Sequence, residues 1–289
     1  MFQELTSSQG QAKLRFERDD LLERGRALIE ESIDYGVTHM RAFVEVDQTV
    51  GMKCLDAGLA LKEEFKDRCR IQICAFAQDP IYSQDDGGKE MLHLMEEAAC
   101  RKGVDVIGST PYVDKTLANQ HANIKWTIGL AIKYSLHLDF HLDYNLDPKI
   151  EPSVYHVIQE LEKANWTSQR VVTLGHCTRL TLFSATEWRK LRDRIGELPI
   201  SFIGLPTSDV FMMGRPHEEA GGGERFRGTL QVPQMIKRYG LQAALGVNNV
   251  GNAFTPHGNC DPLSVASLGV GIYQAGTKTD TEILLVRFG

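Results

Sequence analysis

Two histidines and two aspartates alternate with apolar residues between positions 136 and 144, in the run LHLDFHLDY. A strand projects successive side chains to opposite faces, so the run places His137, Asp139, His141 and Asp143 on one face. Burying unpaired charge is costly, and four ionisable groups on one face therefore favour a functional site over simple packing. His141 and Asp143, at the end of the run, are the first candidate catalytic residues. A hydrogen-bonded polar layer without a catalytic role is the alternative.

A second histidine ends another apolar run, VVTLGH at positions 171–176. An imidazole at the end of a strand can bind a metal or transfer a proton, because its ordinary pKa lies near neutrality. A purely structural histidine would give the same pattern. The prediction that His176 is functional therefore depends on its pairing with His141 on the neighbouring predicted strand.

Four further polar residues at the ends of predicted strands could contact a substrate. Gln78 could bind a substrate amide or cap a loop, and we weigh the two equally. Thr207 lies in the segment GLPTSD, which could also be a turn that caps the following element. Asn248 and Asn249 follow the last predicted strand, where an amide can orient a substrate but cannot act as a general base.

Seven apolar runs alternate with amphipathic segments along the chain. The predicted strands are residues 37–46, 70–77, 104–108, 136–141, 170–175, 200–205 and 243–247. The predicted helices are residues 9–32, 53–66, 89–101, 122–134, 152–164, 185–195 and 232–239. Such alternation predicts an α/β fold with a parallel sheet, because parallel neighbours need crossover connections.

The choice between a doubly wound sheet and a barrel depends on the glycines. No glycine-rich phosphate turn follows an early strand, and the glycine run at 221–223 neither follows a strand directly nor precedes Lys-Ser/Thr. This favours a (β/α)8 TIM barrel, in which the chemistry takes place at the carboxyl ends of the strands.

The composition excludes several classes of protein. The 289 residues are 42% hydrophobic and 24% charged, which is typical of a soluble globular chain, and no linker divides them, so we predict a single domain over 1–289. A net charge of -6 without a basic stripe argues against nucleic acid as a partner. No apolar run is long enough to cross a membrane, and the start lacks a signal-peptide pattern. Six scattered cysteines predict reduced thiols and a cytoplasmic location.

Seven stretches spread over nearly the whole chain resemble the amidohydrolase superfamily, and within it the bacterial cytosine deaminases and a fungal cytosine-deaminase-like subgroup. They are GVTHMRAFVEVD, IQICAFAQDPI, DVIGSTPYVD, DFHLDYNLD, TLGHCTRL, GLPTSDVFMMGR and LGVNNVGNAFTPHGNCDPL. The resemblance implies a TIM-barrel-like hydrolase of non-peptide C–N bonds, in which zinc or iron activates a water molecule. It also implies that His141 and His176 are metal ligands and that Gln78 binds the substrate amide.

The chain departs from the pattern of this superfamily in three places. The His-x-His pair of the first strand is absent, because the chain begins inside the helical segment that would follow that strand, so we expect an incomplete barrel. Tyr144 occupies the position of the proton-shuttling glutamate, and Asn248 that of the aspartate that is both ligand and base. Two histidines are one ligand short of an ordinary catalytic zinc site, so the cofactor is zinc, iron or none, with Asp143 as a conceivable third ligand.

Two functions therefore stay open. The first is an amidohydrolase-like enzyme acting on a small cyclic amide, amidine or related heterocycle, with catalytic His141, Asp143, His176 and Asn248 and substrate-binding Gln78, Tyr144, Asn249 and Thr207. The second is a metal-free enzyme of isomerisation, cyclisation or elimination, or a non-catalytic remnant that binds a ligand or a partner subunit. A missing strand would leave unpaired sheet edges, which predicts a homo-oligomer.

Overall fold

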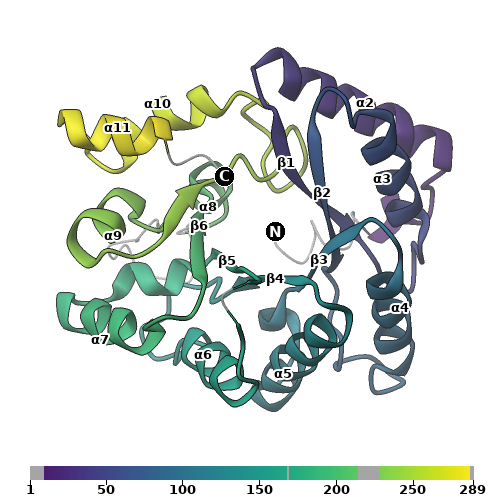
Figure 1. The fold of residues 1–289 in the computed structure, drawn as a ribbon, viewed down its shortest axis with the longest axis horizontal. Coiled ribbons are helices and arrows are strands. Elements are labelled where there is room, and N and C mark those ends of the chain that lie inside the picture. The colour runs from purple at the N-terminus through teal and green to yellow at the C-terminus, as the bar shows by residue number, and fades with distance from the viewer. Residues whose placement is uncertain (1–9, 168, 214–227, 287–289) are drawn as a thin grey trace, which may run out of the picture. The chain divides into compact units, whose positions relative to one another are not determined.

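The computed structural model describes residues 10–167, 169–213 and 228–286 of the chain, and the glycine run at 221–223 lies outside them. The strands in the described part are β1 (His39–Glu45), β2 (Arg70–Ala77), β3 (Val104–Ser109), β4 (His137–Leu142), β5 (Val172–His176), β6 (Ile200–Gly204) and β7 (Ala243–Leu245). They are hydrogen-bonded in chain order. All seven predicted strands are thus present, and the predicted alternation of strands and helices is confirmed (Figure 1).

The helices between and after the strands are α2 (Arg18–Asp34), α3 (Lys53–Glu64), α4 (Lys89–Cys100), α5 (Leu117–Tyr134), α6 (Val154–Lys163), α7 (Ala185–Ile195), α8 (Pro206–Met212), α9 (Val232–Tyr239), α10 (Pro262–Ile272) and α11 (Lys278–Val286). Two 3-10 turns, η1 (Pro111–Val113) and η2 (Thr178–Leu182), complete the described elements. None of the helices in this part of the chain is long and apolar enough to span a membrane.

Two helices differ from the sequence-based prediction for local reasons. The segment predicted as one helix over 9–32 is interrupted after a first helical turn at residues 10–13, and α2 begins only at Arg18. The helix α5 begins five residues before its predicted start, because the side chain of Thr116 accepts a hydrogen bond from the backbone N–H of Asn119 and caps it there. The other predicted helices agree with the structure to within a few residues.

The chain divides into two compact units. Unit 1 comprises Met1–Phe140 and Glu160–Val172, and unit 2 comprises His141–Gln159 and Thr173–Gly289. The prediction of a single domain over 1–289 stays a prediction.

Unit 1 is built around a regular parallel ladder. The strands β1 and β2 pair without a shift from His39 opposite Arg70 to Glu45 opposite Phe76. The helix α3 packs against both strands, α4 packs against β2 and β3, and α5 packs against β3 (Figure 1). Cys74, Phe76 and Val106 form a buried apolar cluster on the neighbouring strands β2 and β3. The ladder therefore fixes the carboxyl ends of β1 and β2 side by side.

Unit 2 contains β5, β6 and β7, of which β6 and β7 pair in parallel from Phe202 opposite Ala243 to Gly204 opposite Leu245. The helix α7 begins with a capping box, in which Ser184 and Glu187 each bond the other's backbone N–H. The helix α8 follows β6 at once, in the segment for which a capping turn was one of the two alternatives, and Pro206 stands in its first turn. This arrangement places Thr207, Ser208 and Asp209 directly after a strand.

The ionisable row on β4 has two kinds of surroundings. In unit 1, Asp139 is buried and paired with Arg41, whose Nη1 lies 2.5 Å from its Oδ2. The Nδ1 of His137 accepts a hydrogen bond of 2.9 Å from the backbone N–H of Val171. These two residues have structural partners, as the polar-layer alternative expects. His141, at the end of the row, belongs to unit 2.

Candidate active site

The imidazoles of His141 and His176 meet at the ends of β4 and β5, as the sequence predicted. Their ring centroids lie 4.8 Å apart with the planes at 87°, an edge-to-face contact. The ring of Tyr144 lies against His176 on another side, with centroids 4.2 Å apart. Only 9% of His141 and 6% of His176 is exposed. The structure thus brings three of the predicted site residues into one aromatic group within unit 2, in which the two histidines are buried and Tyr144 is partly exposed.

A buried carboxylate holds His176 in place. The Nδ1 of His176 lies 2.8 Å from Oδ1 of Asp209, and Thr229 donates its hydroxyl proton to Oδ2 of Asp209 at 2.7 Å. Burial raises the pKa of Asp209, and the hydrogen bond from His176 acts in the opposite direction. In the tautomer whose Nδ1–H donates to this carboxylate, the imidazole is oriented so that Nε2 can exchange a proton with another group.

Sequence reasoning missed Asp209 as a site residue. It lies 33 positions after His176 and in the first turn of α8, so no periodic pattern links the two. The available signal was an aspartate placed shortly after the end of a predicted strand, where barrel enzymes hold functional groups.

Burial and the nearby His176 lower the pKa of His141 well below its ordinary value, so its imidazole is neutral at physiological pH. Gly175 provides the room for this ring. A Cβ atom at position 175 would lie 2.9 Å from Cδ2 and 3.3 Å from Nε2 of His141. A glycine at this position therefore allows the two strands' histidines to pack together.

The backbone is left-handed at four residues of the candidate site. Positive φ angles occur at Asp143 (49°), His176 (63°), Cys177 (45°) and Asn248 (64°). Among the described residues other than glycine, only Ser135, Asn165 and Gln274 share this feature. Residues in this conformation cost free energy and persist where the surrounding structure imposes them, often at functional sites. The left-handed backbone residues thus lie at the same strand ends as the side chains of the candidate site.

Asp143, which the sequence predicts as a catalytic residue, bonds the backbone at the start of α6 in this structure. Its Oδ1 accepts a hydrogen bond of 2.7 Å from the backbone N–H of Ser153, and its Oδ2 one of 3.1 Å from that of Val154. Both donors stand at the start of α6, whose first N–H groups have no partner within the helix. Asp143 therefore caps a helix in this structure, and the catalytic role predicted for it stays a prediction.

Two substitutions separate the capping role of Asp143 from a catalytic one. Asp143→Ala removes both acceptors and is expected to lower the free energy of unfolding by about 1 kcal/mol, the usual cost of losing a helix cap. Asp143→Asn keeps one acceptor oxygen and is expected to lose less stability and no activity. Urea unfolding of the three proteins measures the difference. A lower kcat in the Asn variant, with its stability intact, would return Asp143 to the catalytic set.

The same variants have a pH signature. Burial raises the pKa of Asp143 from 3.8 to about 6, so the folded protein holds this proton more tightly than the unfolded chain does. The contribution of Asp143 to the free energy of unfolding is therefore complete below pH 3.8 and declines as the pH rises to about 6. We expect the Asp143→Asn variant to lack this decline when unfolding is measured across that interval.

Three other predicted site residues in unit 2 lie near the ends of β6 and β7. Asn248 donates from Nδ2 to Oγ of Ser208 at 2.6 Å, and Thr207 donates to the carbonyl of Val247 at 3.1 Å. Thr207 and Asn249 line a cavity of about 100 Å³, together with Val247, His257, Gly258, Asn259, Ser264, Val265 and Leu268. Neither His141 nor His176 lines it. The roles of Thr207, Asn248 and Asn249 stay predictions, as does that of Gln78, which belongs to unit 1.

The imidazoles of His141 and His176 provide two donors for a metal, one fewer than a catalytic zinc normally has from its protein. In the described residues, the group of three or more potential ligands whose ligand atoms lie within 4.8 Å of one another is Glu45, Asp47 and Asp79, in unit 1. The two histidines belong to unit 2. The cofactor prediction, zinc or iron or none, therefore stays a prediction, and so does the role of Asp143 as a third ligand.

Comparison with known proteins gives relatives in sequence and in structure. The curated N-isopropylammelide isopropyl amidohydrolase of Pseudomonas sp. (strain ADP) is 28% identical over 151 residues, which are 51% of this chain and 32% of that protein. The structure of 5-methylcytosine deaminase from Klebsiella pneumoniae, liganded with 5-fluorocytosine, superposes with a TM-score of 0.86 at 25% identity, over 99% of this chain and 66% of the deaminase. No protein-family model matches the chain.

A second solved structure shows the same fold. N-isopropylammelide isopropylaminohydrolase from Burkholderia multivorans has a TM-score of 0.71 at 21% identity, over 90% of this chain and 60% of that one. These similar proteins are hydrolytic enzymes of the amidohydrolase superfamily. The TIM-barrel-like fold class is confirmed, with seven strands in the described residues. The chain spans about a third of the curated relative and less than two thirds of each solved structure.

Proposed function

We propose that this chain is an amidohydrolase-superfamily enzyme that hydrolyses a C–N bond of a small cyclic amide, amidine or related heterocycle. The observation that carries the proposal is the buried pair of His141 and His176, with His176 bonded to Asp209, at the ends of two consecutive strands. The names of the similar proteins, a 5-methylcytosine deaminase and two isopropylammelide hydrolases, support this class of substrate. The finer assignment to a fungal cytosine-deaminase-like subgroup rests on the seven sequence stretches.

In this proposal His176 transfers the protons. Its Nε2 accepts a proton from the attacking water, and the carbon that is attacked gains a C–O bond and a tetrahedral geometry. The proton then passes from Nε2 to the departing nitrogen as the C–N bond breaks, so that ammonia or an amine leaves. Asp209 stabilises the imidazolium that exists between these two steps, through the 2.8 Å hydrogen bond to Nδ1.

His141 and Tyr144 serve different functions in this scheme. The neutral His141 does not repel the imidazolium of His176, because its own pKa lies far below the ordinary value. The ring nitrogens of His141 can donate a hydrogen bond to the substrate or accept one from it. The Tyr144 ring covers one side of His176 and keeps bulk water away from it. The cytoplasmic location and the homo-oligomer belong to the proposal as well.

The direct test is release of ammonia or isopropylamine from cytosine, 5-methylcytosine and N-isopropylammelide, each incubated with the purified protein. We expect release from at least one of them above a heat-denatured control. Elemental analysis for zinc and iron, before and after dialysis against a chelator, decides whether activity follows metal content. If no compound is hydrolysed although one binds in calorimetry, the non-catalytic alternative replaces this proposal.

A further inference from the structure

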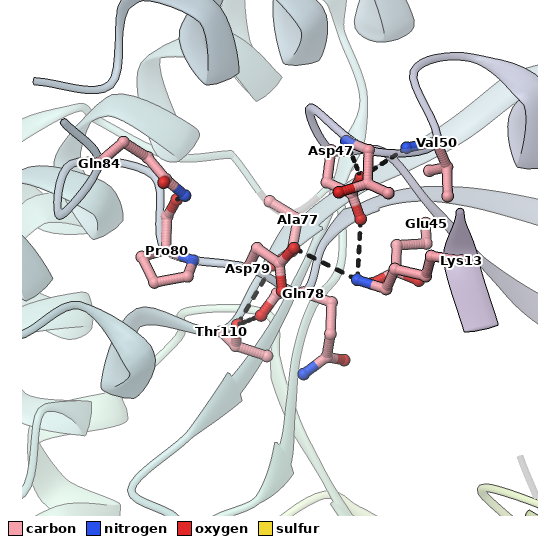
Figure 2. A network of polar contacts seen from close by, with 11 residues as sticks. Lys13, Glu45, Asp47, Val50, Ala77, Gln78, Asp79, Pro80, Gln84 and Thr110 are labelled. Atoms are coloured by element: carbon pink, nitrogen blue, oxygen red, sulfur yellow. Dashed lines mark hydrogen bonds and ion pairs between the residues drawn. The ribbon is translucent and has the colours of Figure 1, made fainter. Parts of the chain in front are cut away.

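Lys13 has unusual surroundings in unit 1. Its side chain is 4% exposed, and its Nζ lies 2.5 Å from Glu45, 2.9 Å from Asp47 and 3.2 Å from Asp79 (Figure 2). Burial acts to lower the pKa of Lys13, but the charge of Glu45 and the hydrogen bonds to Asp47 and Glu45 outweigh it and raise the pKa. The side chain is thus an ammonium ion at any pH of interest, enclosed by three carboxyl groups. We call Lys13, Glu45, Asp47 and Asp79 the Lys13 cluster.

The Lys13 cluster joins three separate segments of unit 1. Lys13 ends the helical turn at residues 10–13, Glu45 is the last residue of β1, and Asp79 follows the end of β2 by two positions. Asp47 also accepts hydrogen bonds from the backbone N–H groups of Thr49 and Val50, at 2.7 and 2.8 Å. One ammonium therefore ties the segment before α2 to the carboxyl ends of two paired strands.

Gln78 lies between the two contacts that hold its backbone. On one side, the hydroxyl of Thr110 donates to the carbonyl oxygens of Ala77 and Gln78, at 3.2 and 2.8 Å. On the other side, Asp79 bonds Lys13. Figure 2 shows the Gln78 amide directed away from the Lys13 cluster, with no contact to the residues drawn there. These contacts thus fix the backbone of residues 77–79. The amide of Gln78 points away from the Lys13 cluster and is left to bind a substrate.

We propose that Lys13 is a positioning residue: by holding Asp79 at the end of β2, its ammonium orients the Gln78 amide for binding of the substrate. This inference rests on the proposed function, together with the sequence-based prediction that Gln78 binds the substrate amide. Removal of the ammonium would leave three carboxyl groups within 4.8 Å of one another without their cation, and their repulsion would displace the Asp79 segment.

The kinetic test compares Lys13→Met with the wild type. We expect KM to rise by about tenfold, the loss of roughly one substrate hydrogen bond, while kcat stays within about twofold. Lys53→Met is the matched control, because Lys53 also contacts the segment before α2, through the carbonyl of Phe16 at 3.3 Å, and lies outside the Lys13 cluster. The control is expected to keep the wild-type KM. A fall in kcat at unchanged KM would overturn the inference.

A double-mutant cycle with Gln78→Ala separates positioning from general destabilisation. If Lys13 acts through Gln78, then Lys13→Met adds nothing to the KM of the Gln78→Ala variant; a further rise equal to that in the wild type overturns the inference. Should Lys13→Met fail to fold, Asp79→Asn removes the same link at a more exposed site, where the side chain is 42% exposed. It is expected to give the same rise in KM.

Hydrogen exchange distinguishes failure of the inference from failure of the proposed function. We expect the amides of residues 77–84 to exchange faster in Lys13→Met than in the wild type and in Lys53→Met. Unchanged exchange overturns the positioning role even if the enzyme is active. Faster exchange in a protein that hydrolyses none of the heterocycles overturns the proposed function, and the substrate-binding part of the inference with it.

Discussion

The His176→Ala variant is expected to lower kcat by about two to four orders of magnitude, the range that a general acid–base group contributes. The substitution removes the Nε2 that would carry the proton from water to the leaving nitrogen. It also leaves Asp209 buried with Thr229 as its remaining side-chain partner. The ratio of the wild-type kcat to that of the variant is obtained from initial rates of ammonia release. These are measured on the heterocycle that the enzyme hydrolyses fastest.

The control for this variant is His93→Ala, which removes an exposed histidine from α4 in unit 1. Its kcat is expected to equal that of the wild type. Circular dichroism and thermal unfolding check that His176→Ala is folded at the assay temperature. A folded His176→Ala protein that retains more than about a third of the wild-type kcat would remove His176 from the mechanism, because no acid–base group is worth so little.

The Gly175→Ala variant is expected to lose about two orders of magnitude in kcat while it remains folded. The added methyl group would lie 2.9 Å from Cδ2 of His141, closer than Cβ atoms approach other heavy atoms, so the imidazole has to move. A displacement of about 1 Å in a catalytic constellation can cost about a hundredfold in rate. Kinetics and the NMR shifts of the His141 ring protons measure the effect.

Gly129→Ala provides the comparison for Gly175→Ala. Gly129 lies within α5, and nothing lies within 4 Å of the position that its Cβ would take. We expect full activity and a free energy of unfolding up to about 1 kcal/mol higher, because alanine favours the helix. Equal activities of the two alanine variants would show that the position of His141 does not limit the reaction.

The ends of the strands that form the candidate site could be predicted from the sequence. Alternation of polar and apolar residues with a period of two depends only on neighbouring residues of the chain. The alternation in LHLDFHLDY placed His141 correctly, but it also placed Asp143 on the same face. The structure ends β4 at Leu142, and the φ angle of 49° at Asp143 takes the chain out of the extended conformation. Beyond that residue the alternation no longer applies, and the carboxylate reaches the start of α6 instead.

Two other residues were beyond the reach of local patterns. Asp209 bonds a histidine 33 positions away, and the spacing depends on the length of everything between them. Lys13 fell within a segment predicted as one amphipathic helix, where a lysine belongs on the solvated face. It is buried because carboxylates 32 to 66 positions further along the chain converge on it. The surroundings of both Asp209 and Lys13 are determined by pairing with residues far away in the sequence. A single sequence carries no signal for such pairing.

The left-handed residues at the strand ends also bear on how this protein could be changed. Non-glycine residues in that conformation each cost about 1–3 kcal/mol, an appreciable share of the roughly 5–15 kcal/mol by which a folded protein is stable. Glycine would relieve the backbone at Asp143, His176, Cys177 and Asn248, but at Asp143 and His176 it would also remove the hydrogen bonds to the start of α6 and to Asp209. Three of these four are residues that the sequence marked as catalytic. Thermal tolerance and turnover are thus expected to compete at the same few positions, and a stabilised version of this protein is best sought in its helices.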